Sequence, residues 1–354
     1  MAWTRNRPTG LVYADQQKAA PGFFLAPTGA TVHLLDHTGG TVHSWNAPSG
    51  VAYARLLPDG RLLTLLVGDY TQPHPVANGG IQGLAELDAS SNVVWEHADD
   101  LLHHDAWRLD DGSYYCPGWE PLAPDISARV QGGWPHPDDP EQIWGDVIVH
   151  IGRNGERRIV WRAGDSMSPE DFPICPIDNR KEWAHMNSLR LTRDGHWLVS
   201  FRMTSTVAKI HRQTGELLWT WGPGETSHQH DVRELDNGNI MMFDNGVHRV
   251  RQPGFARVVE VNPENGEIAW QYTDAVLLAF QSFMGGGAQR LGNGNTFITE
   301  AASGRLFQVT AERETVWEWV NPQIRMSHFG PTPVIWRSHW YAPGDPRLPP
   351  QLPV

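Results

Sequence analysis

Histidines recur at one position of a repeated sequence pattern. The pattern is a Leu followed within four residues by Asp-Gly or Asn-Gly, and histidines stand just upstream of several copies. They are His103 and His104 in HHDAWRL, His185 in HMNSLRL, His228 and His230 in HQHDVREL, and His328 in SHFGPTPV. With 17 histidines in 354 residues, this recurrence is not expected by chance and predicts a shared role.

Two kinds of chemistry fit such a set of imidazoles. Neutral imidazole is the most common transition-metal ligand, so His104, His185 and His230 are the expected ligands of one divalent metal, should a metal bind. Imidazoles without a metal act instead as nucleophiles or as general acids and bases. The candidates lie far apart in the sequence, and spacing therefore leaves both chemistries open.

Other polar residues follow the histidines closely. Asp105, Asn187 and Asp231 are expected on the opposite strand face, where they would orient imidazoles of neighbouring strands. Arg202 follows the apolar strand HWLVSF, so it is either half of an ion pair or a group that binds an oxyanion. Trp183 is one of several tryptophans that either wall an aromatic pocket or pack in the core.

A repeated hairpin positions these residues. Each copy is a strand, a polar turn and a second strand that ends in Trp, as in VVEVNPENGEIAW (258–270). The closing residues are Trp45, Trp95, Trp161, Trp219, Trp270 and Trp317. A Trp at one fixed point of every copy predicts packing between neighbouring repeats.

A second hairpin alternates with the first and contains the Asp-Gly or Asn-Gly turn. It spans 54–65, 107–115, 189–201, 233–243 and 289–299. Two hairpins per repeat make a four-stranded blade, so the sequence predicts an all-β, six-bladed β-propeller. The first strand of each blade lines the channel of a propeller, where we expect the histidines to converge.

The ends of the chain are expected to close the propeller. The hairpin at 32–45 lacks inner partner strands, and the segment 327–342 is the expected donor. We expect one domain over residues 1–354, with blades from about residue 22 onward. The Pro-rich insertion 117–146 is too long for a hairpin turn and resembles a lid or binding loop.

Composition excludes several classes of protein. A formal net charge of −12 argues against nucleic acid as a partner. There is no apolar run long enough to span a membrane and no signal peptide in residues 1–22, so we expect a cytoplasmic protein. The two cysteines, Cys116 and Cys175, are expected to be reduced. The oligomeric state does not follow from the sequence.

The segment 182–246 resembles the arylsulfotransferase family. It carries H-x-N-S at 185–188, S-x-R-x-x-S-x-x-x-K-I at 200–210, and Q-H, N-G-N and F-D-N-G within 229–246, in the order of that family. The blade pattern extends the resemblance over roughly residues 30–320. The resemblance implies a six-bladed propeller that moves a sulfuryl group between phenols through a sulfohistidine, without a metal or the sulfate donor PAPS.

The resemblance also implies residue roles. His230 matches the sulfated nucleophile, His185 and Arg202 match the sulfate-binding pair, and His104 matches the remaining channel histidine. The residues expected around a small aromatic substrate are His103, Asn187, His228, His328 and Trp183. No resident cofactor is implied, and one divalent metal is the alternative.

Two other functions remain open. The chain has no close cysteine pair near His230 and resembles a shorter branch of the family. In that branch the same histidines would serve a hydrolase or a lyase acting on a small cyclic or aromatic substrate. The third alternative is a non-catalytic binding propeller, because a fold alone does not fix function.

Overall fold

The computed structural model describes residues 8–68, 76–135, 142–250, 252–327 and 330–350. The chain divides into two compact units. Unit 1 comprises Met1–Gln72, Leu84–Glu96 and Met284–Val354, and unit 2 comprises Pro73–Gly83 and His97–Phe283. Within the described ranges, no helix has the length and apolar character needed to cross a membrane.

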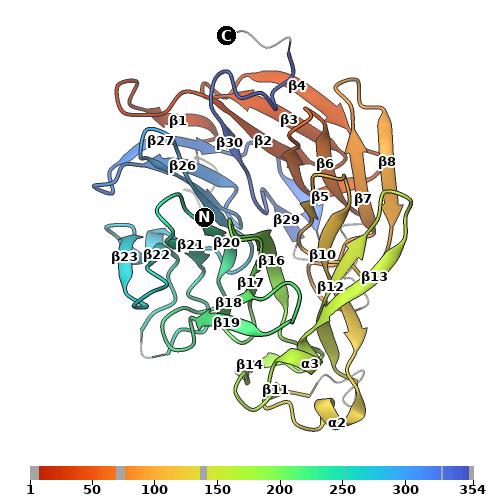
Figure 1. The fold of residues 1–354 in the computed structure, drawn as a ribbon. Helices are drawn as coiled ribbons and strands as arrows, with labels where there is room; N and C mark the ends of the chain where they lie inside the picture. The colour runs from red at the N-terminus through yellow and green to blue at the C-terminus, as the bar shows by residue number, and fades with distance from the viewer. Residues whose placement is uncertain (1–7, 69–75, 136–141, 251, 328–329, 351–354) are drawn as a thin grey trace. The chain divides into compact units, whose positions relative to one another are not determined.

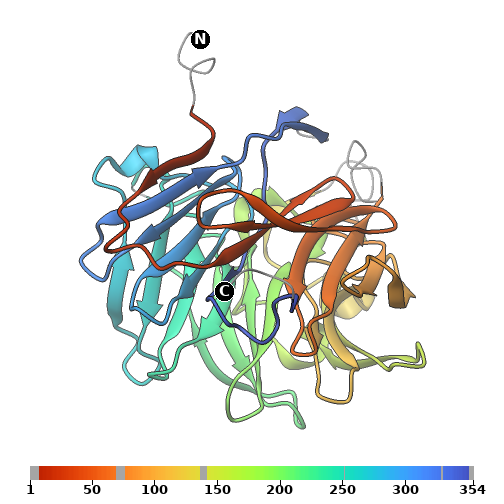
Figure 2. The same cartoon turned by 90° about the horizontal axis from the view of Figure 1, so that it is seen from above.

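Three sheets, antiparallel except for one parallel pair of strands, make up most of unit 2, coloured from orange-yellow to cyan in Figures 1 and 2. The first contains β9 (Trp107–Arg108), β10 (Tyr114–Pro121), β12 (Trp144–Ile151) and β13 (Arg157–Arg162), with β15 (Glu182–Trp183) parallel to β12. The second contains β16 (Met186–Leu191), β17 (Trp197–Phe201), β18 (Thr206–Ile210) and β19 (Leu217–Trp221). The third contains β20 (His230–Glu234), β21 (Ile240–Asp244), β22 (Arg257–Val261) and β23 (Ile268–Tyr272).

Unit 2 also carries short elements outside these sheets. They are the parallel pair β11 (Gly132–Trp134) and β14 (Ile174–Asn179), and the helices α2 (Pro124–Ser127), α3 (Ala163–Ser166) and η1 (Leu277–Ala279). Strands β10 and β12 pair from Tyr114 to Pro121, so both ends of the expected insertion 117–146 belong to a hairpin. The irregular part between the two strands is correspondingly shorter.

Three more sheets make up unit 1. One contains β30 (Trp340–Tyr341), β2 (Phe23–Thr28), β3 (Thr31–Asp36) and β4 (Thr41–Asn46). The next contains β5 (Gly50–Leu56), β6 (Leu62–Val67), β7 (Gly83–Leu87) and β8 (Val93–Ala98). The last contains β24 (Gly287–Arg290), β25 (Thr296–Glu300), β26 (Arg305–Val309), β27 (Thr315–Val320) and β1 (Gly10–Ala14), and a separate hairpin joins β28 (Arg325–Ser327) to β29 (Gly330–Thr332).

These six small sheets are the blades of a β-propeller, and both predicted hairpin repeats are confirmed. The inner hairpins depend on glycine, because Gly60, Gly112, Gly195, Gly238 and Gly294 all have φ between +78° and +89°. That left-handed backbone disfavours any residue with a side chain beyond Cα. The Asp-Gly and Asn-Gly repeat is therefore a set of tight turns that start each blade.

The N-terminal and C-terminal segments of the protein both contribute strands to one sheet. Trp340–Tyr341 pairs with β2, so the C-terminal segment supplies one strand as expected, but the N-terminal segment supplies the strand between it and β3. The segment 327–342 therefore does not provide both partners. The start of this segment instead belongs to a local antiparallel hairpin, in which Arg325–Ser327 pairs with Gly330–Thr332.

The tryptophans that end the hairpins pack as predicted in three of six blades. Trp45, Trp161 and Trp317 are buried, whereas Trp95, Trp219 and Trp270 are half-buried. The Nε1 atom of Trp161 donates to the carbonyl of Gly215 in the turn of the next sheet, at 3.1 Å. In the next blade Trp221, two residues beyond the repeat position, donates to Gly266 in the same way at 3.0 Å.

Candidate active site

The first strands of the unit 2 sheets bring most of the predicted histidines together. Strand β16 contacts both β9 and β20, its neighbours on either side. His104, His185 and His230 stand just before or at the start of these three strands. His104 and His185 have left-handed backbone, with φ of 59° and 71°. Such conformations in residues other than glycine are sparsely populated and concentrate at functional sites.

Three imidazoles form a continuous chain. The Nδ1 atoms of His103 and His104 lie 3.0 Å apart, and the Nε2 atoms of His104 and His185 lie 3.1 Å apart. His103 is fully buried and stacks on Trp119, with ring centroids 4.2 Å apart. Its position inside the core makes His103 a support for His104 rather than an exposed substrate contact.

A buried carboxyl group stands at each end of this chain. His185 Nδ1 lies 2.6 Å from Glu182 Oε1, and His103 Nε2 lies 3.4 Å from Asp146 Oδ1. Asp146 also accepts hydrogen bonds from the backbone N–H groups of Ala184 and Met186, which fixes the loop that carries His185. Sequence reasoning missed both carboxyl groups, although Glu182 stands three residues before His185.

The protonation of Glu182, at one end of the imidazole chain, determines which nitrogen atoms of the chain carry protons. Burial, and then the charge of Asp146, raise the pKa of Glu182 to about 8, so this carboxyl is protonated at neutral pH. It donates to His185 Nδ1, while Glu182 Oε2 accepts from Trp119 Nε1 at 3.0 Å. Burial and the charge of Arg202 hold the pKa of His185 well below its usual value. Neutral His185 then donates from Nε2 to His104, and His104 donates from Nδ1 to His103.

His230 is oriented by a different set of contacts. Its Nδ1 atom lies 2.7 Å from Asn245 Oδ1 and 3.1 Å from the carbonyl of His228, and both of these oxygens accept hydrogen bonds. Nδ1 therefore carries the proton, and Nε2 keeps its lone pair. Asn245 is itself held by donating to the carbonyl of Ser282 at 2.7 Å.

Burial, with Arg202 and His185 nearby, keeps His230 neutral. Burial lowers the pKa of His230 to about 3, and the positive charge of Arg202 adds to the effect. The block F-D-N-G entered only as part of the family resemblance, without a role for its residues, and its Asn245 selects the tautomer of His230. The recurrence of histidine could not reveal this residue, because Asn in such a turn is ordinary.

Arg202 has an ion-pair partner. Its Nη1 atom lies 3.6 Å from Asp178 Oδ1, and Asp178 Oδ2 lies 2.6 Å from His228 Nε2. The partners His228 and Arg202 hold the pKa of Asp178 at about 2 despite its burial. Arg202 is therefore half of an ion pair, and its charge also lowers the pKa values of His185 and His230. The binding of an oxyanion by Arg202 stays a prediction.

The remaining predicted residues have mixed positions. Asn187 is buried and donates to the carbonyl of Gln229 at 2.8 Å, so it joins β16 to the segment before β20. Trp183 is fully buried and donates to the carbonyl of Phe172 at 2.8 Å, which places it in the core of unit 2. His328 lies outside the described residues.

The three polar neighbours of the histidines bind main chain and arginine. Asp105 accepts from the backbone N–H of Leu189 at 3.1 Å, and Asp231 accepts from Arg190 at 2.6 Å. They connect neighbouring first strands and so hold the histidine-bearing segments in register. Cys116 and Cys175 do not form a disulfide with each other.

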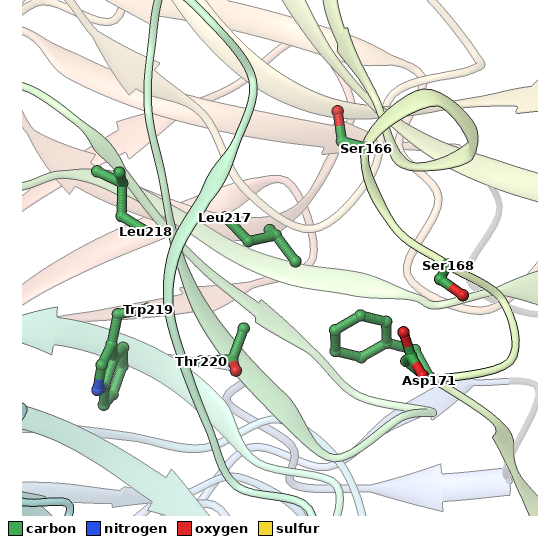
Figure 3. Close-up of a pocket in the computed structure, with 8 residues that line it drawn as sticks. Ser166, Ser168, Asp171, Leu217, Leu218, Trp219 and Thr220 are labelled. Carbon is green, nitrogen blue, oxygen red and sulfur yellow. The ribbon is translucent and has the colours of Figure 1, made fainter.

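An open pocket of unit 2 lies elsewhere. Figure 3 shows Ser168 and Asp171 on one side of it and Leu217, Trp219 and Thr220 on the other. None of the predicted site residues lines this pocket. It therefore carries no part of the histidine chemistry.

Comparison with known proteins supports the resemblance. Residues 169–322 match the family described as arylsulfotransferase (ASST), a range that includes His185, Arg202, His230 and Asn245. The resemblance predicted from the sequence is confirmed over that range. Comparison with curated proteins gives no significant match.

Solved structures share the fold at low sequence identity. A protein of unknown function from Bacteroides caccae has a TM-score of 0.53 at 16% identity, covering 85% of this chain and 94% of its own. A streptogramin B lyase has a TM-score of 0.51 at 10% identity, covering 94% and 93%. Hydrazine synthase from Kuenenia stuttgartiensis has a TM-score of 0.50 at 10% identity, covering 89% and 90%. At these identities the similarity concerns the fold alone.

Proposed function

We propose that unit 2 transfers a sulfuryl group between phenolic compounds and that His230 carries the group. The observation that supports this most strongly is the contact of His230 Nδ1 with Asn245 Oδ1 at 2.7 Å. It leaves the lone pair of Nε2 available to attack sulfur. The match of residues 169–322 to arylsulfotransferases supports the same reaction.

The reaction has two balanced half-steps. In the first, His230 Nε2 attacks the sulfur of an aryl sulfate, an N–S bond forms, and the S–O bond to the phenol breaks. The electron pair of that bond leaves with the phenol oxygen, which takes a proton. In the second, the oxygen of an acceptor phenol attacks the sulfur and loses its proton, and the N–S bond breaks to restore neutral His230.

The imidazole chain supplies and recovers the proton. Glu182, His185, His104 and His103 are joined by hydrogen-bonding distances of 2.6, 3.1 and 3.0 Å. In the first half-step His185 Nε2–H passes its proton to the leaving oxygen while the Glu182 proton moves to His185 Nδ1, and in the second the acceptor phenol returns a proton by the reverse path. The positive charge of Arg202 stabilises the sulfuryl oxygens as negative charge shifts during transfer.

The test is the intact mass of the protein after incubation with p-nitrophenyl sulfate. We expect a gain of one sulfuryl group in the wild type and none in His230→Ala. Asn245→Ala should form the adduct more slowly, because His230 then populates both tautomers. An adduct that persists in His230→Ala would assign the carrier to another residue.

The same experiment separates the alternative reactions. Release of p-nitrophenol without any adduct, at a rate independent of an acceptor phenol, would contradict transfer and favour a hydrolase. No adduct and no p-nitrophenol would contradict the proposal outright. A lyase or a binding propeller would then be the reading to pursue.

A further inference from the structure

We propose that Cys175, Asp178, His228 and His248 form a zinc site, distinct from the histidine chain. Their ligand atoms all lie within 4.8 Å of one another. The group combines one thiol, one carboxyl and two imidazoles, a donor set that suits tetrahedral Zn²⁺. In the described part of the chain, His104, His185 and His230 do not form such a group.

The ligand atoms of the cluster are close enough to share one ion after small side-chain shifts. Cys175 Sγ lies 3.5 Å from His248 Nδ1, and Zn–S and Zn–N bonds of ordinary length separate such a pair by about 3.5 Å. Asp178 Oδ1 lies 3.8 Å from the same His248 nitrogen. The contact of Asp178 Oδ2 with His228 Nε2, at 2.6 Å, must lengthen when an ion enters between them.

Hydrogen bonds orient His228 for such a role. Ser227 Oγ donates its proton to the carbonyl of Val247 and therefore accepts from His228 Nδ1, at 3.1 Å. Nδ1 of His228 thus carries a proton, and Nε2 points at Asp178. A metal-bound imidazole characteristically donates its other N–H in this way. Zn²⁺ would be bound between His228 Nε2 and Asp178 Oδ2, in place of their direct contact.

The backbone around the ligands is held in place. His228 and His248 both have left-handed φ, of 62° and 63°. The loop before His248 is fixed because Gly246 N–H donates to the carbonyl of Ser227 at 2.9 Å. On the other side Cys175 N–H donates to the carbonyl of Met203 at 2.9 Å. Strained backbone that persists under such constraints is typical of ligand sites.

The cluster is also accessible and suitably charged. The side chain of His248 is 27% exposed and that of Asp178 11% exposed, so an ion can enter from solvent. A Cys thiolate and the Asp178 carboxylate together neutralise Zn²⁺. Asp178 now pairs with Arg202, whose Nη1 atom lies 3.6 Å from Asp178 Oδ1. Zinc bound to the Asp178 carboxylate would weaken this ion pair and leave Arg202 freer to bind an anion.

The test is direct metal binding by the full chain. The protein is stripped with a chelator, loaded with Zn²⁺, dialysed and measured by mass spectrometry for metal content. Loading with Co²⁺ adds a second readout, because a thiolate ligand produces an intense near-ultraviolet charge-transfer band. We expect one ion per chain and the thiolate band.

Substitutions assign the ligands. Cys175→Ser should lose the thiolate band, and both Cys175→Ser and His248→Gln should weaken Zn²⁺ binding at least about 100-fold. The matched controls Cys116→Ala and His211→Gln, at a buried cysteine and a half-buried histidine of the same unit outside the cluster, should bind as the wild type does. Thermal unfolding of each metal-free variant establishes that it is folded.

Several results would overturn the site. One is the absence of a stoichiometric ion after loading. Another is unchanged binding in folded Cys175→Ser and His248→Gln. Loss of the ion in His230→Ala but not in Cys175→Ser would assign the metal to the histidine chain instead. None of these readouts uses sulfuryl transfer, so the zinc site and the proposed reaction succeed or fail separately.

Discussion

Units 1 and 2 follow the same hairpin repeat but use it differently. In unit 1 aromatic rings of neighbouring strands and sheets pack together. The ring centroid of Phe24 lies 5.4 Å from that of Trp317, 5.1 Å from that of Trp319 and 5.9 Å from that of Trp340. In unit 2 the segments before the first strands carry imidazoles, and buried carboxyl groups and Arg202, which follows β17, lie near them. The repeat therefore sets the strands, and the polar residues at strand ends and connections decide whether a blade only packs or also carries the candidate site.

The comparison indicates that, within the same repeat pattern, the residues that stabilise the fold differ from the residues that form the candidate site. Burial of aromatic side chains is favourable and needs no fixed protonation state. Buried histidines and carboxyl groups cost free energy unless each finds a partner. Unit 2 meets that condition with hydrogen bonds between neighbouring sheets. Substitutions should consequently have different consequences in the two units.

The largest effect is expected from His230→Ala. Removing the proposed nucleophile should lower sulfuryl transfer at least about 1000-fold, because the two proposed half-steps would lose their covalent intermediate. The rate of p-nitrophenol release with a saturating acceptor phenol measures this. His33→Ala, a half-buried histidine of unit 1 bonded to Ser44, is the matched control and should retain the wild-type rate. Equal losses in both variants would break the distinction between the units.

Phe24→Ala should destabilise the protein without removing its chemistry. Phe24 is fully buried, and deleting such a ring costs about 3–5 kcal/mol of the free energy of unfolding. Denaturant unfolding measures the loss, and the rate per folded molecule should stay unchanged. Val12→Ala, at an exposed position of the same unit, should change stability by less than about 0.5 kcal/mol. A reduced rate in folded Phe24→Ala would show that unit 1 takes part in the chemistry.

Arg202→Lys should have a moderate effect on transfer. Lysine keeps the positive charge but cannot present two parallel N–H donors to the sulfuryl oxygens, so the rate should fall roughly 100-fold. Steady-state kinetics should place the loss mainly in kcat. Arg193→Lys, an exposed arginine of unit 2, serves as the control. An unchanged kcat in Arg202→Lys would make Arg202 only the ion-pair partner of Asp178.

The effect expected from Glu182→Gln is confined to high pH. The folded protein keeps the Glu182 proton up to a pKa of about 8, whereas the unfolded chain loses it near 4.5. The unfolded state binds fewer protons between these values, so the stability of the wild type falls as pH rises through that window. Glutamine mimics the protonated acid, donating to His185 and accepting from Trp119, and removes this dependence.

Denaturant unfolding at about pH 5 and about pH 9 measures the difference. Relative to the wild type, Glu182→Gln should gain stability at the higher pH and not at the lower. Glu225→Gln, an exposed carboxyl of the same unit, should follow the wild type at both values. Parallel profiles for wild type and Glu182→Gln would mean that Glu182 is ionised in the folded protein, with its proton on the imidazole chain.

The sequence by itself determined the blades. Alternating apolar residues around Asp-Gly and Asn-Gly turns define both hairpins locally, since turn conformation and strand alternation depend on neighbours in the chain. It also placed His104, His185, His230 and Arg202 among the candidates. These residues recur at one register or belong to blocks of a known family, so their position in the repeat was enough to find them.

Only the tertiary structure decided how these groups are protonated and what surrounds them. Asn245 sets the tautomer of His230, and Glu182 and Asp146 end the imidazole chain, through contacts between segments that the sequence keeps apart. The cluster of Cys175, Asp178, His228 and His248 likewise spans 73 residues of sequence between its end members. Protonation and ligand geometry depend on burial and distances of a few ångström, which arise only when the strands pack.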